Sequence, residues 1–112
     1  TDETDYQLAM VGVNVAYANA YANALSTAQA EYASAGQAFL GESINLSEYL
    51  SRIDAATNLY NQTMRDAVAD YNASAKPIWE KWIADNADKF DSQGVFDRMM
   101  ELLAEAQAKY QN

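Results

Sequence analysis

Residues 6–30 form a run of twenty-five residues without one charged side chain, in a chain where charged residues make up 21% of the sequence. The run has no proline and one glycine, and its apolar residues recur at helical spacing. A helix at the surface of a single protein usually keeps a charged stripe toward water. A helix without charge on any face is therefore expected to be covered on several sides, by its own chain or by further copies.

The rest of the sequence favours long helices in a single domain. The chain has 112 residues with one proline and four glycines, and half of its residues are apolar. Breaks in helical structure are therefore few, and the length suffices for one domain with a modest core. We predict an all-α fold in a single helical domain over residues 1–112. Its predicted architecture is an up-and-down helical bundle, with two long antiparallel helices and two shorter C-terminal helices.

The first long helix is expected to begin near Thr4, which fits a capping box with Gln7. Its apolar residues fall on two faces. One face comprises Leu8, Val11, Val15, Ala18, Ala22 and Leu25, and the other comprises Met10, Tyr17, Tyr21, Ala24 and Ala28. Gly36 and Gly41 are expected to bracket the connection to the next helix.

The second long helix has the clearest start signal, because Asn45 followed by Glu48 is a capping-box pattern. Glu48 is also expected to pair with Arg52, one helical turn later. An apolar heptad stripe follows, made of Leu46, Leu50, Ile53, Thr57, Tyr60, Met64, Ala67 and Tyr71. Pro77 has no amide hydrogen, which predicts a break or a kink over residues 72–76. A short helix is then expected over residues 77–88, and a last helix whose seam starts at Phe96.

Composition excludes several function classes. The chain has no histidine and no cysteine, so it lacks the commonest general base, the commonest metal ligand and any thiolate nucleophile. We therefore assign no catalytic, metal-binding or cofactor-binding residue, expect no cofactor, and expect a protein that is not an enzyme. The net charge of −9 argues against binding to nucleic acid or to an anionic membrane surface. Polar side chains such as Asn14 and Asn19 in the uncharged run argue against a membrane span.

Two polar patterns have both a functional and a plain structural interpretation. Asp97, Glu101 and Glu105 form an acidic row that could attract calcium or a basic partner, but a solvated helix face is the preferred interpretation. Asn45, Asn61 and Asn72 each start an Asn-x-Ser/Thr triplet, the acceptor of N-linked glycans. Coincidence in an asparagine-rich chain is the preferred interpretation of all three.

Two groups of apolar residues are candidate binding surfaces. The uncharged run offers an interface with another chain, for which we select Val13, Tyr17, Ala20, Tyr21 and Ala24. Tyrosine is enriched at interfaces, although it also packs between helices of one chain. The C-terminal region offers an aromatic–methionine cluster, which is either a local core or a ligand or docking patch. Its residues are Trp79, Trp82, Phe96 and Met99.

The sequence thus leads to two hypotheses. The first is a non-enzymatic structural or interaction protein that self-associates into an oligomer or filament through the uncharged helix, or that binds another helical protein. The alternative is a monomeric extracytoplasmic binding module, which holds an apolar ligand or a peptide helix at the aromatic–methionine cluster. Because the chain begins at Thr1 and not at methionine, it is expected to be either a processed protein or a trimmed chain. Processing would suit an extracytoplasmic or secreted location.

Overall fold

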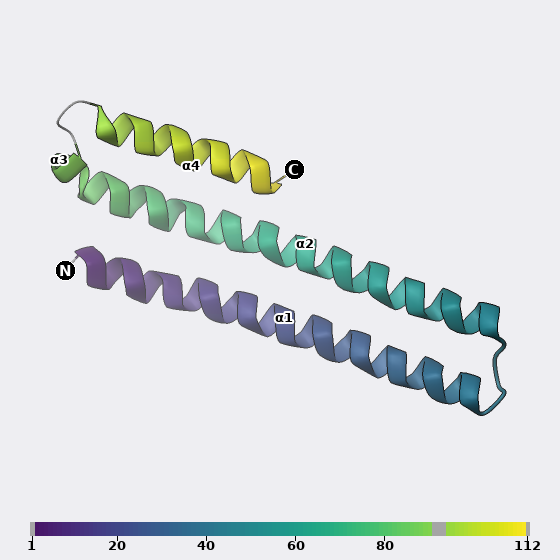
Figure 1. The fold of residues 1–112 in the computed structure, drawn as a ribbon. Coiled ribbons are helices and arrows are strands. Elements are labelled where there is room, and N and C mark those ends of the chain that lie inside the picture. The colour runs from purple at the N-terminus through teal and green to yellow at the C-terminus, as the bar shows by residue number, and fades with distance from the viewer. Residues whose placement is uncertain (1, 91–93, 112) are drawn as a thin grey trace. The chain divides into compact units, whose positions relative to one another are not determined.

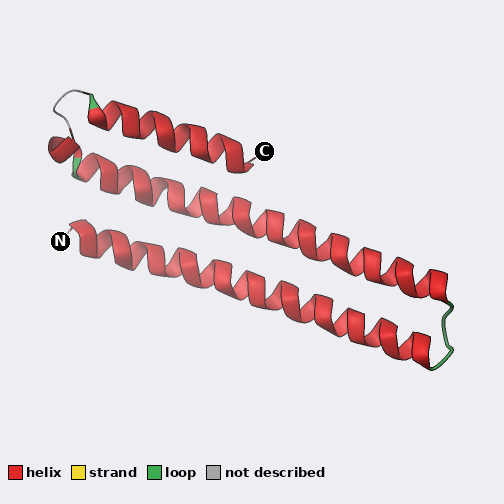
Figure 2. Ribbon diagram, in the orientation of Figure 1, coloured by secondary structure: helices red, strands yellow, loops and turns green. Residues whose placement is uncertain are grey.

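A computed structural model describes residues 2–90 and 94–111, without the side chains of residues 2, 89, 90, 96, 110 and 111. Every regular element in these two ranges is a helix (Figures 1 and 2), which confirms the all-α class. The elements are α1 (Asp2–Leu40), α2 (Leu46–Asp85), α3 (Ala87–Phe90) and α4 (Val95–Gln111). Thr4 lies inside α1 and does not cap it, because the helix already includes Asp2.

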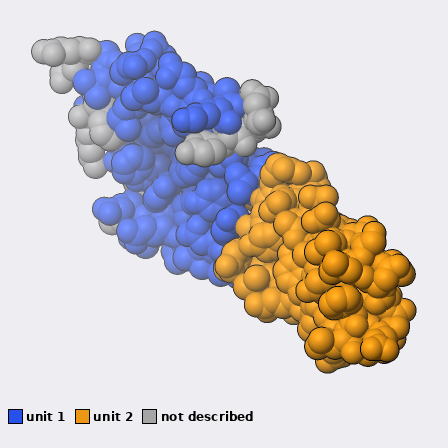
Figure 3. Space-filling view, turned by 45° about the vertical axis from the view of Figure 1, so that its right-hand side comes forward, with its two compact units in different colours: residues 1–17, 68–112 blue, residues 18–67 orange. Residues whose placement is uncertain are grey.

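The chain divides into two compact units, which Figure 3 distinguishes by colour. Unit 1 comprises residues 1–17 and 68–112, and unit 2 comprises residues 18–67. Both long helices contribute to both units, so each unit contains one segment of α1 and one segment of α2. A single domain over the whole chain stays a prediction.

In unit 2 the two long helices pack through small side chains. The buried apolar residues described in this unit are all alanines, namely Ala24, Ala28, Ala35, Ala56 and Ala67. Larger groups flank them: the rings of Phe39 and Tyr49 stack with centroids 5.0 Å apart, and the Tyr32 hydroxyl lies 2.6 Å from Thr57 Oγ1. These contacts join late residues of α1 to early residues of α2, so the two segments are antiparallel within this unit.

The connection between α1 and α2 spans residues 41–45, and the expectation that Gly36 begins it was wrong. Gly36 lies within α1, which continues to Leu40. Beyond that end, the Ser43 amide donates to the Ala38 carbonyl at 2.9 Å and the Glu42 amide donates to the Phe39 carbonyl at 3.1 Å. This pair of hydrogen bonds is a Schellman motif, which needs a left-handed residue directly before its last donor. Glu42 takes that conformation with φ of 63°, although glycine is the usual residue there.

The start of α2 is capped as the sequence predicts. The Glu48 amide donates to Asn45 Oδ1 at 2.8 Å, and the Asn45 amide donates to Glu48 Oε1 at 3.3 Å. Two amides that have no partner within the helix are thereby satisfied by one pair of side chains. Arg52, expected to pair with Glu48, instead contacts Glu31 on α1.

We predicted a break or a kink over residues 72–76 and a separate helix over residues 77–88. The break and the separate helix were wrong, because Pro77 lies inside α2, and the kink stays a prediction. Packing on both sides of the proline holds the helix together: Ala75 is fully buried against Met10, and Trp79 packs on the same cluster. Pro77 and Ala73 are both exposed, so the carbonyl that loses its donor remains open to water. The helix ends after Asp85, where the Asn86 side chain donates from Nδ2 to the Trp82 carbonyl at 2.7 Å.

Candidate functional site

One apolar face of α1 remains exposed in unit 1. Leu8, Val11 and Val15 lie on successive turns of the helix, with 67%, 54% and 52% of their surfaces accessible. Met10 and Val13, on the opposite side of the same turns, are buried against α2. The helix therefore buries one of the two apolar faces that the sequence offers and leaves the other one uncovered. We call Leu8, Val11 and Val15 the exposed face of α1.

The five residues selected as an interface differ in how far the chain itself covers them. Val13 and Ala24 are buried within the chain, which leaves them little area for a second molecule. Tyr17 is half-buried, and its ring meets the Tyr71 ring edge-on in unit 1, with the two ring centroids 5.8 Å apart. In unit 2, Ala20 is half-buried and lines a surface hollow of about 490 Å³ together with Ala24, whereas Tyr21 is exposed. The interface assignment itself stays a prediction.

A second feature of unit 1 is a cavity of about 760 Å³, bounded by residues of α1, α2 and α4. Trp79, Trp82 and Met99 line it, so three of the four residues predicted as a ligand or docking patch share one site. The side chain of the fourth, Phe96, lies outside the described residues. The local-core interpretation also holds in part, because Trp79 packs against the buried cluster around Met10.

Aromatic rings from both long helices form much of the cavity wall. The Tyr6 and Trp82 rings are tilted at 48° with centroids 5.6 Å apart. Tyr71 meets Tyr17 edge-on at 5.8 Å and Trp79 edge-on at 6.4 Å. All five rings line the cavity. Edge-to-face pairs of this kind hold rings in defined orientations, so the wall presents ring faces and edges at fixed angles.

Polar groups in the cavity come from amide side chains. Asn72 on α2 is 8% exposed and Gln107 on α4 is 7% exposed, and both line the cavity, as does the exposed Asn14. The Nδ2 atom of Asn72 is buried, and no residue in the described part of the chain offers it a hydrogen-bond acceptor. Sequence reasoning considered Asn72 only as a glycan acceptor, and its burial leaves no room for a glycan on that atom. Asn72 follows Val68 by four residues and precedes Ala75 by three, and both of these lie on the packed side of α2. This spacing was the signal in the sequence that Asn72 could be buried.

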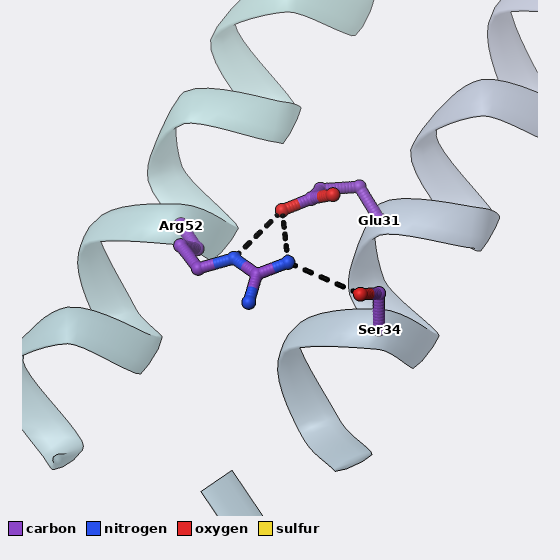
Figure 4. A network of polar contacts seen from close by, with 3 residues as sticks. All are labelled: Glu31, Ser34 and Arg52. Carbon is purple, nitrogen blue, oxygen red and sulfur yellow. Dashed lines mark hydrogen bonds and ion pairs between the residues drawn. The ribbon is translucent and has the colours of Figure 1, made fainter. Parts of the chain in front are cut away.

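A cluster of polar side chains joins the two long helices in unit 2 (Figure 4). The Arg52 guanidinium contacts Glu31 Oε1 through Nε at 2.8 Å and through Nη2 at 2.7 Å, and Nη2 also donates to Ser34 Oγ at 3.2 Å. The Arg52 and Glu31 side chains are 34% and 41% exposed, so water screens the pair and its contribution is about 0.5 kcal/mol. The cluster links α1 to α2 and contains no group suited to catalysis.

The acidic row on α4 is partly neutralised by its own helix. Arg98 Nη1 lies 2.9 Å from Glu101 Oε2 and 3.9 Å from Glu105 Oε1. Within the described ranges, no three acidic side chains gather closely enough to hold a metal ion. The same part of the chain contains no helix that is both long and apolar enough to cross a membrane.

Comparison of the chain with protein-family models, with curated proteins and with solved structures gives no match.

Proposed function

We propose that this chain is a non-enzymatic helical subunit that assembles with further copies of itself, into a closed oligomer or a filament, through the exposed face of α1. In this proposal the subunit is an up-and-down bundle, in which two long antiparallel helices are followed by two shorter C-terminal ones. The observation that carries the proposal is the exposure of Leu8, Val11 and Val15, each more than half accessible on adjacent turns. Clustered exposed apolar residues on a small protein are typical of an interaction surface.

The charge distribution of the chain argues that a second copy, and not a basic partner, covers the exposed face of α1. With 16 acidic and 7 basic residues, two copies of the chain repel one another in most orientations. Contact through residues 6–30 brings no charged side chain of that run into the interface. A basic partner would instead favour an acidic surface, such as the one formed by Asp66 and Asp70. An uncharged apolar face is best matched by another of its kind, and a second copy supplies one.

The mass of the protein in solution tests this proposal. Light scattering during gel filtration should give a mass above the 12.4 kDa of one chain, and the mass should rise with protein concentration. Val11→Glu and Val15→Glu each place a charge on the exposed face without entering the buried core. Each should return the mass to that of one chain, because pairing would bury an unpaired carboxylate.

Ala69→Glu is the matched control. It adds the same single negative charge at an exposed position of α2, between the carboxylates of Asp66 and Asp70. The proposal expects assembly to survive this change. A wild-type mass of 12.4 kDa at every concentration would refute self-assembly, and so would equal dissociation by Ala69→Glu and Val11→Glu.

Salt provides a second test of the same contact. Raising the ionic strength shortens the range of charge repulsion, which falls to about 8 Å at physiological salt. Copies that carry a net charge of −9 and meet through an uncharged face should therefore associate more strongly as salt increases. Association that weakens with salt would mean that charge pairs, and not the exposed face of α1, make the contact.

A second candidate function, the monomeric binding module, is favoured by the cavity in unit 1 and by its buried Asn72 donor, for which the described residues supply no acceptor. None of the three residues of the exposed face of α1 lines that cavity. Self-assembly and ligand binding would therefore use separate surfaces, and each can be tested without the other.

A further inference from the structure

We infer that the cavity in unit 1 binds a neutral aromatic small molecule that carries a hydrogen-bond acceptor, such as a ketone oxygen, and that Asn72 Nδ2 donates to that acceptor. The inference rests on the second candidate function, the binding module, and is independent of self-assembly. It assigns a chemical class to the ligand and a recognition role to one residue.

The buried donor of Asn72 is the observation that requires an acceptor. Asn72 is only 8% exposed, and its Nδ2 atom has no hydrogen-bond partner among the described residues. Nearly all buried polar groups in folded proteins are hydrogen-bonded, and the exceptions often belong to binding sites. Nδ2 itself exposes almost no surface, so water in the cavity does not pair with it in this arrangement of the side chains. A ligand whose entry moves the side chains around Nδ2 can supply the missing acceptor.

The walls of the cavity fit a planar ring system. Rings of Tyr71, Trp79 and Trp82 line the α2 side, and Met99 and Leu103 of α4 provide flexible apolar contacts. Aromatic ligands gain from offset and edge-on contacts with such rings, and methionine sulfur packs well against aromatic edges. The volume of about 760 Å³ falls within the range of about 300–1,000 Å³ that is usual for small-molecule sites.

The electrostatics of the site favour a ligand without charge. Among the described residues that line the cavity, none is acidic or basic. A cation would find no carboxylate to pair with, and an anion would be repelled by the net charge of −9. The amides of Gln107 and Asn14 supply further neutral polar contacts, so a second polar atom on the ligand can be accommodated.

A pair of matched probes tests the inference. Fluorenone and fluorene have the same tricyclic shape and no charge, but only fluorenone carries a ketone oxygen. Their binding to the full chain is measured by equilibrium dialysis, with quenching of the Trp79 and Trp82 fluorescence as a second readout. Fluorenone should bind about tenfold more tightly than fluorene, as expected for one hydrogen bond to a buried donor.

Asn72→Leu removes the donor while keeping the number and branching of the side-chain heavy atoms. Fluorenone affinity should fall about tenfold in this variant, fluorene affinity should not fall, and the preference between the probes should disappear. Because the wild-type donor has no partner within residues 2–90 and 94–111 as described, the variant is expected to fold at least as stably, which circular dichroism checks. Asn61→Leu is the matched control, since Asn61 is exposed on the same helix and should leave both affinities unchanged.

A second variant locates the site without depending on Asn72. Ala106→Trp adds a large ring at an exposed position on the cavity rim, and it should weaken both probes together. Equal affinity of wild type for the two probes would overturn the acceptor inference while leaving the binding module intact. Absence of binding by both probes would overturn the inference and the binding module together. Neither result depends on the mass of the assembly.

Discussion

Replacing Glu42 with glycine should stabilise the fold. Glu42 closes the C-terminus of α1 and is the one non-glycine residue with positive φ in the described ranges. Its conformation is required because the amides of Glu42 and Ser43 both bond back to the last turn of α1. A side chain at this position crowds the following carbonyl, whereas glycine has no Cβ to do so.

The size of the gain follows from two opposing effects. The left-handed conformation costs a residue with a side chain about 1–2 kcal/mol, and glycine avoids this cost. Glycine also adds freedom to the unfolded chain, which offsets about 0.5–1 kcal/mol of the gain. The net effect should be about 0.5–1 kcal/mol in favour of Glu42→Gly. For a chain of this length that corresponds to a rise of about 2–4 °C in the melting temperature.

The assay is thermal unfolding followed by circular dichroism, at one fixed protein concentration because self-assembly would link stability to concentration. Glu42→Ala is the matched control, since it removes the carboxylate near the negative end of the α1 dipole but retains the Cβ atom. Glu42→Ala should raise the unfolding free energy by no more than about a few tenths of a kcal/mol. Equal gains from Glu42→Gly and Glu42→Ala, or no gain from Glu42→Gly, would refute the backbone argument.

Two further substitutions test the contacts that order unit 2, both by urea unfolding. Asn45→Ala should lower the unfolding free energy by about 1 kcal/mol, because it removes the capping oxygen. Asn45→Gly should lower it by only about a few tenths of a kcal/mol, so equal losses in the two variants would contradict the capping role of Asn45. Tyr32→Phe should cost about 1 kcal/mol by removing the hydroxyl 2.6 Å from Thr57 Oγ1. If the same loss appears when Tyr32→Phe is made in a Thr57→Val background, the two side chains do not depend on each other.

The parts of the fold that the sequence predicts correctly are those set by neighbours along the chain. Asn45 and Glu48 form the capping box because residues three apart meet in the first turn whatever surrounds them. The heptad stripe of α2 is likewise confirmed from Ile53 to Tyr71, where its residues are buried or half-buried. Leu46 and Leu50 at its start are exposed, since they lie beside the connecting turn, where α1 ends.

The buried face of α1 could not be chosen from sequence. Charged residues usually mark the solvent side of a helix, and residues 6–30 contain none. Hydrophobicity and spacing therefore do not decide whether Val11 or Val13 is buried in the core. The structure buries Val13 because Met10, on the same side, packs against Ala75 and the aromatic residues of α2. This choice depends on a partner helix more than fifty residues away in sequence.

Pro77 shows how packing outweighs a local signal. A proline inside a helix costs about 3 kcal/mol, which argues for a break when the segment is considered alone. Ala75 and Ile83, on either side of it, are both buried in unit 1, and a break would remove that contact area from the core. Burial of a few side chains offsets the cost of the proline, since one Ile-sized side chain contributes about 1.5–3 kcal/mol.

The apolar residues of the candidate site could be predicted from the sequence, and its polar residues could not. Trp79, Trp82 and Met99 were grouped from their residue types, and all three line one cavity. Asn72 and Gln107 are thirty-five positions apart on different helices, and no local pattern joins them. Asn72 and Gln107 line one cavity because of how α4 lies within unit 1. Spacing along the sequence does not determine that placement.

The alanine packing of unit 2 has a consequence for how its two helices are aligned. The buried alanines, three on α1 and two on α2, present small and similar methyl surfaces, so by themselves they oppose a slide of one helix along the other only weakly. What fixes the alignment is a small number of unlike groups: the Tyr32–Thr57 hydrogen bond, the Glu31–Arg52 pair and the stacked rings of Phe39 and Tyr49. Register in this unit is thus specified by these few unlike contacts, and the alanines determine how closely the helices approach.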